Sequence, residues 1–176
     1  LEILSLGVYV LTAIRRSSLA GAEGAFKYFL LGAFSSAFFL YGVALVYGYA
    51  GSMQFAEINE AVRNDATNQT LLLIGMGLLS VGLLFKVGAA PFQAWTPDVY
   101  QGAPTPVTAF MAAATKVAAF GALLRLFYVA FGSDRWSWQP MLWVIAILTM
   151  LVGAVPAPAQ TDVKRGLADP AGAHTG

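Results

Sequence analysis

The composition of this 176-residue chain points to a membrane, because 58% of its residues are hydrophobic, 11% are charged and the mean hydropathy is +0.67. These values are typical of lipid-facing helices and exclude an ordinary soluble globular domain. A formal net charge of +1 argues against nucleic-acid binding, which calls for a clustered basic face. With no cysteine and one histidine, iron–sulfur, bis-histidine haem and zinc sites are excluded, so we expect no cofactor and no metal on this chain.

The apolar runs predict an all-α, polytopic transmembrane helix bundle. We expect a membrane domain over 1–165 and an atypical tail over 166–176, for which alteration, truncation and disorder are open explanations. The expected helices cover about 1–14, 18–49, 70–96 with a break near 87–91, 105–131 and 140–160. The second of these is longer than one span requires, so we expect it to tilt or protrude.

The turns between these helices predict their sides of the membrane. Arg15 and Arg16 close the first helix, and basic residues favour the cytoplasmic side. The polar stretch 51–69 holds three acids against Arg63, which favours the outside, and its apolar spacing is compatible with a short interfacial helix. We therefore place 98–104, Lys164 and Arg165 inside, and 51–69 and 133–139 outside.

The first hairpin is expected to bring an acid and a base to comparable depth. Glu2 lies thirteen residues before Arg15, and Lys27 lies eleven residues after Arg16. We interpret Glu2 and Lys27 as an ion pair inside the bundle. Glu23, one helical turn before Lys27, is the alternative partner, and that pair would be a local salt bridge near the membrane edge.

Lys86 lies next to a predicted break in the third helix. Gly88 weakens the helix at this point, and Pro91 removes a backbone donor and clashes with the preceding turn. Irregular backbone is tolerated at membrane depth only inside protein or beside a water-filled cavity, and broken helices recur in transporter sites. A lysine beside such a break therefore indicates an ion or proton path. The alternative, an ordinary proline kink, explains Pro91 and leaves Lys86 unexplained.

Lys116 in the next helix matches Lys86 in depth. Lys86 lies twelve residues before Asp98, and Lys116 lies twelve residues after Pro104, so each is roughly 18 Å from the turn at ~1.5 Å per residue. That depth is near the middle of a ~30 Å hydrocarbon core, where a charged lysine costs roughly 2.5–3.5 kcal/mol. Desolvation and mutual repulsion disfavour two charges, so we expect a coupled pair that exchanges a proton. Snorkelling, or fixed hydrogen bonds to carbonyls freed by the break, are the alternatives.

The residues around these two lysines form a long motif. It reads F-K-x-G-x-x-P-F-x-x-W-T-P-D-V-Y-x-G-A-P-T-P-V from Phe85, and Thr115 and Lys116 follow in the next helix. The motif resembles the antiporter-like membrane subunits of respiratory complex I, and within them it is most similar to the N type. The resemblance extends from Leu1 to Arg165 and implies that the chain is the middle part of a larger antiporter-like fold.

The resemblance implies a proton-translocating subunit of NADH-quinone oxidoreductase without a redox centre of its own. Proton transfer would involve Glu2, Lys27, Lys86 and Lys116, and positions matching Glu2 and Lys27 would form the glutamate–lysine pair of the family. Partner subunits would handle NADH and quinone with their flavin and iron–sulfur clusters. The chain would contact other antiporter-like and small membrane subunits in a bacterial cell membrane, and we expect the isolated fragment to be inactive.

The sequence departs from the family pattern at several positions, and it leaves two other functions as alternatives. Gln93 stands where many members have a histidine, and an amide does not titrate. Pro156 and Pro158 disrupt the end of the fifth helix, and His174 matches a family histidine only in position. A cation/proton antiporter subunit and an inactive structural membrane fragment are the alternative functions. The sequence A-A-A-T-K-V ending at Val117 favours the N type over antiporter relatives, which are rich in histidine here.

Overall fold

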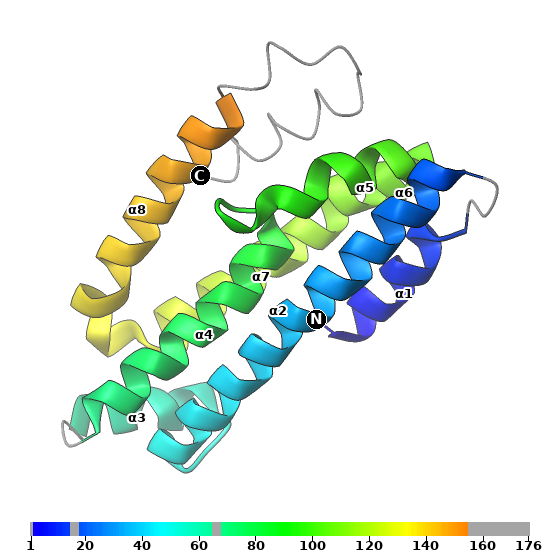
Figure 1. Cartoon of the computed structure of the whole chain (residues 1–176). Coiled ribbons are helices and arrows are strands. Elements are labelled where there is room, and N and C mark those ends of the chain that lie inside the picture. The colour runs from blue at the N-terminus through cyan, green and yellow to red at the C-terminus, as the bar shows by residue number, and fades with distance from the viewer. Residues whose placement is uncertain (1, 15–17, 65–67, 155–176) are drawn as a thin grey trace.

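The computed structural model describes residues 2–14, 18–64 and 68–154, and over these ranges the chain is helical and contains no strand (Figure 1). The helices are α1 (Glu2–Thr12), α2 (Leu19–Ala50), α3 (Phe55–Asn64), α4 (Gln69–Val87), α5 (Thr96–Gly102), α6 (Thr105–Phe110), α7 (Lys116–Arg125) and α8 (Arg135–Ala154). Short 3-10 turns cover Phe92–Trp95 and Gly132–Asp134, and wider π turns cover Met111–Thr115 and Leu126–Ala130. The predicted all-α bundle with one discontinuous helix is confirmed.

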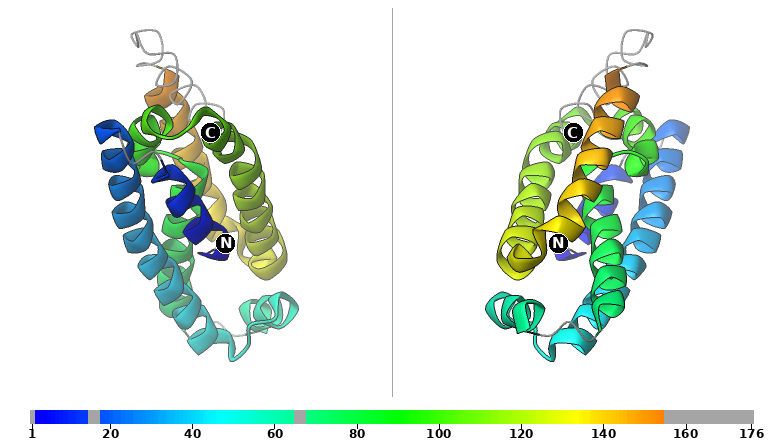
Figure 2. Two further views of the ribbon diagram at one scale, coloured as in Figure 1. Left: turned by 90° about the vertical axis from the view of Figure 1, so that its right-hand side faces the viewer. Right: turned by 90° about the vertical axis from the view of Figure 1, so that its left-hand side faces the viewer.

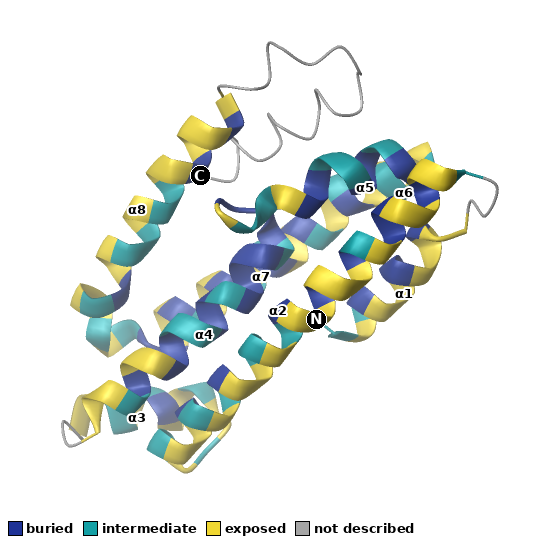
Figure 3. Ribbon diagram, in the orientation of Figure 1, coloured by how far each residue is buried: buried dark blue, intermediate teal, exposed yellow. Residues whose placement is uncertain are grey.

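Within the part of the chain that the structure describes, four helical segments are long and apolar enough to cross a membrane, namely Leu19–Ala50, Gln69–Gly102, Thr105–Ala130 and Gly132–Ala154. Large apolar side chains such as Phe34, Trp143 and Leu151 are exposed, as expected of surfaces that meet lipid, and exposed residues recur along α2 and α8 (Figure 3). α2 has 32 residues, so at ~1.5 Å per residue it is about 48 Å long against a hydrocarbon core of ~30 Å.

Local backbone chemistry sets the ends of α2. Before its first turn, the Oγ of Ser18 accepts a hydrogen bond from the Gly21 N–H at 3.2 Å, which satisfies one of the donors that a helix start leaves open. After its last turn, Gly51 has a φ of +70°, and its N–H bonds to the Tyr47 carbonyl. Glycine adopts this left-handed conformation without the penalty that a Cβ would impose.

Glycines allow α2 and α4 to pack closely against each other. A Cβ on Gly42 of α2 would lie 2.7 Å from the Leu79 backbone nitrogen of α4, and a Cβ on Gly82 of α4 would lie 2.5 Å from the Phe39 Cβ. Small residues of this kind let membrane helices approach to backbone contact. This pair of helices therefore forms the frame against which α5, the part of the broken helix beyond Gly88, is positioned.

The remaining elements gather at the two ends of that frame. α1 lies between α2 and the α6–α7 segment (Figure 2). The first turns of α2 contact α5 at one end, and α3 contacts the end of the α7 segment at the other. There Ser133 donates two hydrogen bonds to the Asn59 side chain, at 3.2 and 2.7 Å. The two stretches that the sequence predicts on the external side of the membrane thus meet at one end of the bundle. The structure does not describe seven residues on which other predictions depend, namely Arg15, Arg16, Lys164, Arg165, Pro156, Pro158 and His174.

α8 begins at Arg135, earlier than the expected start of the fifth helix at 140, so that Pro140 lies inside the helix. The Ser137 hydroxyl donates to Asp134 at 2.8 Å, and the Trp138 indole N–H donates to the Phe131 carbonyl at 3.0 Å. These bonds order the turns before Pro140, which then costs the helix the one hydrogen bond that its missing N–H would make.

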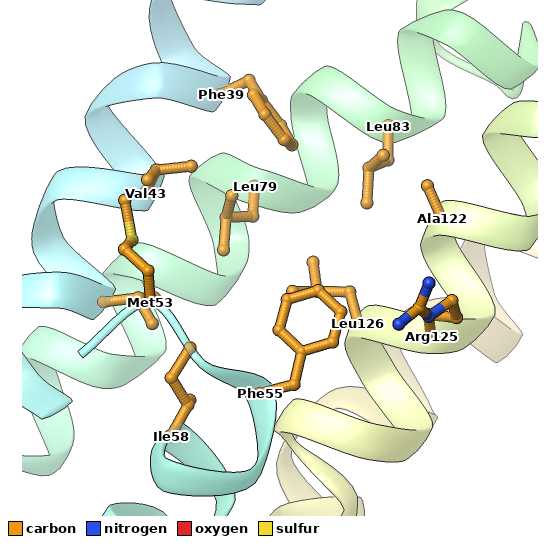
Figure 4. Close-up of a pocket in the computed structure, with 11 residues that line it drawn as sticks. Phe39, Val43, Met53, Phe55, Ile58, Leu79, Leu83, Ala122, Arg125 and Leu126 are labelled. Carbon is orange, nitrogen blue, oxygen red and sulfur yellow. The ribbon is translucent and has the colours of Figure 1, made fainter. Parts of the chain in front are cut away.

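An apolar cavity of about 340 Å³ lies among α2, α3, α4 and α7 (Figure 4). Arg125 supplies the charge among its lining residues. The guanidinium of Arg125 lies 5.7 Å from the centre of the Phe55 ring, a distance suited to a cation–π contact. Arg125 therefore contacts α3 at the end of the bundle away from α5.

Candidate functional site

The break in the third transmembrane segment comes directly after Lys86. α4 ends at Val87, and Gly88 adopts the left-handed conformation with a φ of +80°. The Gly88 N–H bonds to the carbonyls of Leu84 and Phe85 at 2.9 and 3.1 Å, as in a glycine-terminated helix end. The sequence pattern of Gly88 and Pro91 therefore predicted the discontinuity correctly, and Lys86 lies in the last turn before it.

Two side chains satisfy backbone groups released by the break. The indole N–H of Trp95 donates to the Phe85 carbonyl at 3.2 Å, and the Ala90 N–H donates to the Thr149 hydroxyl of α8 at 3.0 Å. Both bonds are buried, where an unpaired backbone group would carry its full desolvation cost. The break is thus a defined structure rather than a frayed helix end.

Lys86 is almost enclosed, with 10% of its side chain exposed. Its ammonium group donates to the Ser5 hydroxyl, lies 3.6 Å from a carboxylate oxygen of Glu2 and lies 5.8 Å from the centre of the Tyr9 ring. Each of these partners comes from α1. The charge of a protonated Lys86 is therefore held by one carboxylate, one hydroxyl and one aromatic face.

Glu2 joins α1 to both of the long helices beside it. One of its oxygens faces Lys86, and the other accepts a hydrogen bond from the Ser36 hydroxyl of α2 at 2.7 Å. The predicted pair of Glu2 with Lys27 was wrong. Ser36 lies nine residues beyond Lys27 on α2, or about 14 Å farther along the axis at ~1.5 Å per residue. α1 is staggered along α2, so equal spacing from the turn did not mean equal depth.

Lys27 instead lies near the α5 end of the bundle. Its ammonium group contacts Glu23 at 2.6 Å and Asp98 at 2.7 Å, and 41% of its side chain is exposed. The local pair with Glu23 is the alternative that the sequence offered. Sequence reasoning placed the other partner, Asp98 of α5, in the hairpin on the cytoplasmic side and gave it no contact. The feature of the sequence that could have indicated this contact is that Asp98 is an isolated acid inside an apolar, proline-rich motif.

Lys116 is 8% exposed and begins α7, directly after the π turn. The residue before it, Thr115, helps to line a small cavity of about 10 Å³ together with Lys86, Ser5 and Tyr28. That volume is about the space which one water molecule requires. The cavity therefore connects the surroundings of Lys86 to the start of α7.

Sequence reasoning missed the hydroxyl groups of this site. Ser5 follows Glu2 at the i,i+3 spacing that places two side chains on one helical face, and Ser36 is one of two adjacent serines in the apolar middle of α2. Both spacings were visible in the sequence. Over the described ranges, no group of three or more histidine, cysteine, aspartate or glutamate side chains is arranged to hold a metal ion.

Comparison with known proteins finds matches over the whole chain. A family model described as "NADH:quinone oxidoreductase/Mrp antiporter, TM" matches residues 1–176. Curated relatives named NADH-quinone oxidoreductase subunit N are 75% identical in a Nocardioides species, 64% in a Parafrankia species and 62% in Rhodococcus opacus. Each match covers all of this chain and 33%, 34% and 33% of the relative, respectively. The chain thus spans about a third of the length of these relatives.

Solved structures show the same arrangement of helices. A chain of respiratory complex I from Thermus thermophilus with bound Aureothin has a TM-score of 0.82 and 46% identity, with 99% of this chain and 36% of that chain covered. A chain of the Mrp complex from a Dietzia species has a TM-score of 0.86 and 27% identity, with 99% and 32% covered.

Proposed function

Because this chain belongs to the NADH:quinone oxidoreductase/Mrp antiporter transmembrane family, we propose that it is part of the N-type proton-translocating subunit of NADH-quinone oxidoreductase. The subunit lies in a bacterial plasma membrane and assembles with other antiporter-like and small membrane subunits. Partner subunits hold the flavin and iron–sulfur clusters and react with NADH and quinone. This chain moves protons and carries out no redox step.

The contact between Glu2 and Lys86 beside the helix break supports this proposal most directly. The 3.6 Å ion pair joins α1 to a lysine that is nearly enclosed by protein, at a point where the backbone changes direction. Ionisable residues inside a membrane are rare and mark ion or proton paths. A purely structural bundle would have little reason to bury a lysine at its least regular point.

The mechanism follows from the order of the groups. Glu2 holds the protonated ammonium of Lys86, and Ser36 holds the other oxygen of Glu2. When the contact with Glu2 weakens, the buried ammonium loses its compensating charge and releases its proton. The small cavity shared with Thr115 offers room for about one water molecule, which carries the proton toward Lys116. A new proton then restores the pair of Glu2 and Lys86.

Arginine substitutions test this path in the full-length subunit within the assembled enzyme. Arginine preserves positive charge but does not release its proton in proteins, so Lys86→Arg and Lys116→Arg should each abolish proton pumping while the complex still assembles. Pumping and quinone reduction are measured together in proteoliposomes. Arg125→Lys is the control, since Arg125 contacts Phe55 away from this path. Undiminished pumping by either lysine variant would remove that lysine from the mechanism.

A cation/proton antiporter subunit is the second candidate, favoured by the fold similarity to the Mrp complex. Sodium-dependent proton exchange in vesicles that contain the full-length protein, without NADH, would support this candidate. A proton-transfer role for Lys27 stays a prediction from the sequence, as does inactivity of the 176-residue chain on its own.

A further inference from the structure

α5, which continues the broken helix beyond its 3-10 turn, lies directly against the backbone of α2. A Cβ on Gly24 of α2 would lie 2.8 Å from the Asp98 carbonyl oxygen, and a Cβ on Gly102 of α5 would lie 2.5 Å from the Ala20 carbonyl oxygen. No side chain therefore fits between the two helices at either point. Small residues permit this approach, but they do not by themselves fix α5 in one position along α2.

Two consecutive residues of α2 supply that fixed position. The ammonium of Lys27 contacts the Asp98 carboxylate at 2.7 Å. The ring of Tyr28 stacks on the Trp95 ring with centroids 4.6 Å apart and planes 24° apart. Asp98 lies in the first turn of α5 and Trp95 immediately precedes it. One contact is electrostatic and directional, the other is a broad buried face, and together they fix both position and rotation.

Trp95 links the position of α5 to the backbone beside Lys86. Its indole N–H donates to the Phe85 carbonyl at 3.2 Å, and its ring centroid lies 5.5 Å from that of Phe85. Phe85 directly precedes Lys86 in the last turn of α4. A shift of α5 along α2 would therefore move the group that satisfies the Phe85 carbonyl, and the backbone beside Lys86 with it.

We infer that Lys27 is a positioning residue whose permanent charge, paired with Asp98, fixes α5 on α2 and thereby sets the geometry of the break beside Lys86. We name the set of Lys27, Tyr28, Trp95 and Asp98 the α5 clamp. The inference rests on the proposed function for its effect on pumping, and it assigns Lys27 a role other than proton transfer. Lys27 and Asp98 are 41% and 27% exposed, and ion pairs that solvent screens contribute little to stability, so the clamp acts on position more than on the fold.

The test uses the full-length subunit in the assembled enzyme. Lys27→Ala and Asp98→Asn remove the ion pair and should lower proton pumping roughly 10- to 100-fold, the scale expected for a ~1 Å misplacement near a reacting group. Lys27→Arg keeps the charge and should preserve pumping, and the exchange of Lys27→Asp with Asp98→Lys should restore most of it. Glu23→Gln is the matched control, because it removes the other carboxylate on Lys27 and leaves the contact with α5.

A second measurement reports the position of α5 directly. Cysteines for spin labels are introduced at the exposed positions Ala22 of α2 and Ala94 before α5, in a full-length subunit and complex from which other reactive cysteines have been removed. Their dipolar coupling should be unchanged in the variants Lys27→Arg and Glu23→Gln, and weakened in Lys27→Ala. Lost pumping in Lys27→Arg with unmoved labels would show that Lys27 carries protons and overturn the inference. Unchanged labels in Lys27→Ala would overturn it as well. If α5 moves as expected while Lys86→Arg still pumps, the clamp stands and the proposed function fails.

Discussion

Glu2→Gln isolates the charge of the Glu2–Lys86 pair, because glutamine can still accept the hydrogen bond from Ser36. Two unit charges 3.6 Å apart attract by about 1 kcal/mol at the dielectric constant of water and by about 5 kcal/mol at an effective value of ~20. Lys86 is 10% exposed, but Glu2 is 37% exposed, and solvent screens the exposed partner. We therefore expect a pair energy of about 1–3 kcal/mol.

A double-mutant cycle measures this energy without the other effects of each substitution. The free energy of unfolding of the full-length subunit in detergent is determined for Glu2→Gln, Lys86→Met and the double variant. The same cycle with Glu2→Gln and Lys27→Met serves as the control, and its two effects should add to within about 0.5 kcal/mol. A coupling below about 0.5 kcal/mol for Glu2 and Lys86, or a larger one for Glu2 and Lys27, would refute the pairing.

Two further substitutions probe the break itself by denaturant titration of the full-length subunit. Gly88→Ala places a Cβ on left-handed backbone and should destabilise by about 1–2 kcal/mol, whereas Gly77→Ala in the open middle of α4 should be neutral or stabilise by up to about 1 kcal/mol. Thr149→Val removes the acceptor of the buried Ala90 N–H and should cost about 1–3 kcal/mol and speed hydrogen exchange at Ala90. Thr149→Ser should preserve both stability and exchange protection.

The discontinuous helix could be predicted from the sequence because its cause is local. Gly88 and Pro91 act on the backbone of their own segment, and their effect does not depend on what packs nearby. The burial of Lys86 and Lys116 followed for a similar reason, since both lie deep within long apolar runs. Properties that depend on one segment alone were therefore accessible without a structure.

The partners of Glu2 and Lys27 could not be predicted in this way. Counting residues from a turn gives equal depth only if the two helices of the hairpin have aligned axes and no stagger. Glu2 of α1 contacts α2 at Ser36 rather than at Lys27. The contact of Lys27 with Asp98 depends on the close approach of α2 and α5, which is set by Gly24. The stagger and rotation of helices arise from packing among several segments, so they cannot be predicted from the sequence of one hairpin.

The π turn at Met111–Thr115 determines the direction in which Lys116 points. A π turn closes its hydrogen bonds one residue later than an α turn, so it acts as a one-residue insertion within an otherwise continuous span. Removing one residue from it would rotate α7 by about 100° relative to α6, given 3.6 residues per turn. Lys116 would then leave its buried position although every side chain of α7 was unchanged. The length of this one turn thus sets which face of α7 is turned toward the bundle interior, and relatives that differ by a single residue here would present a different face of the helix to Lys86.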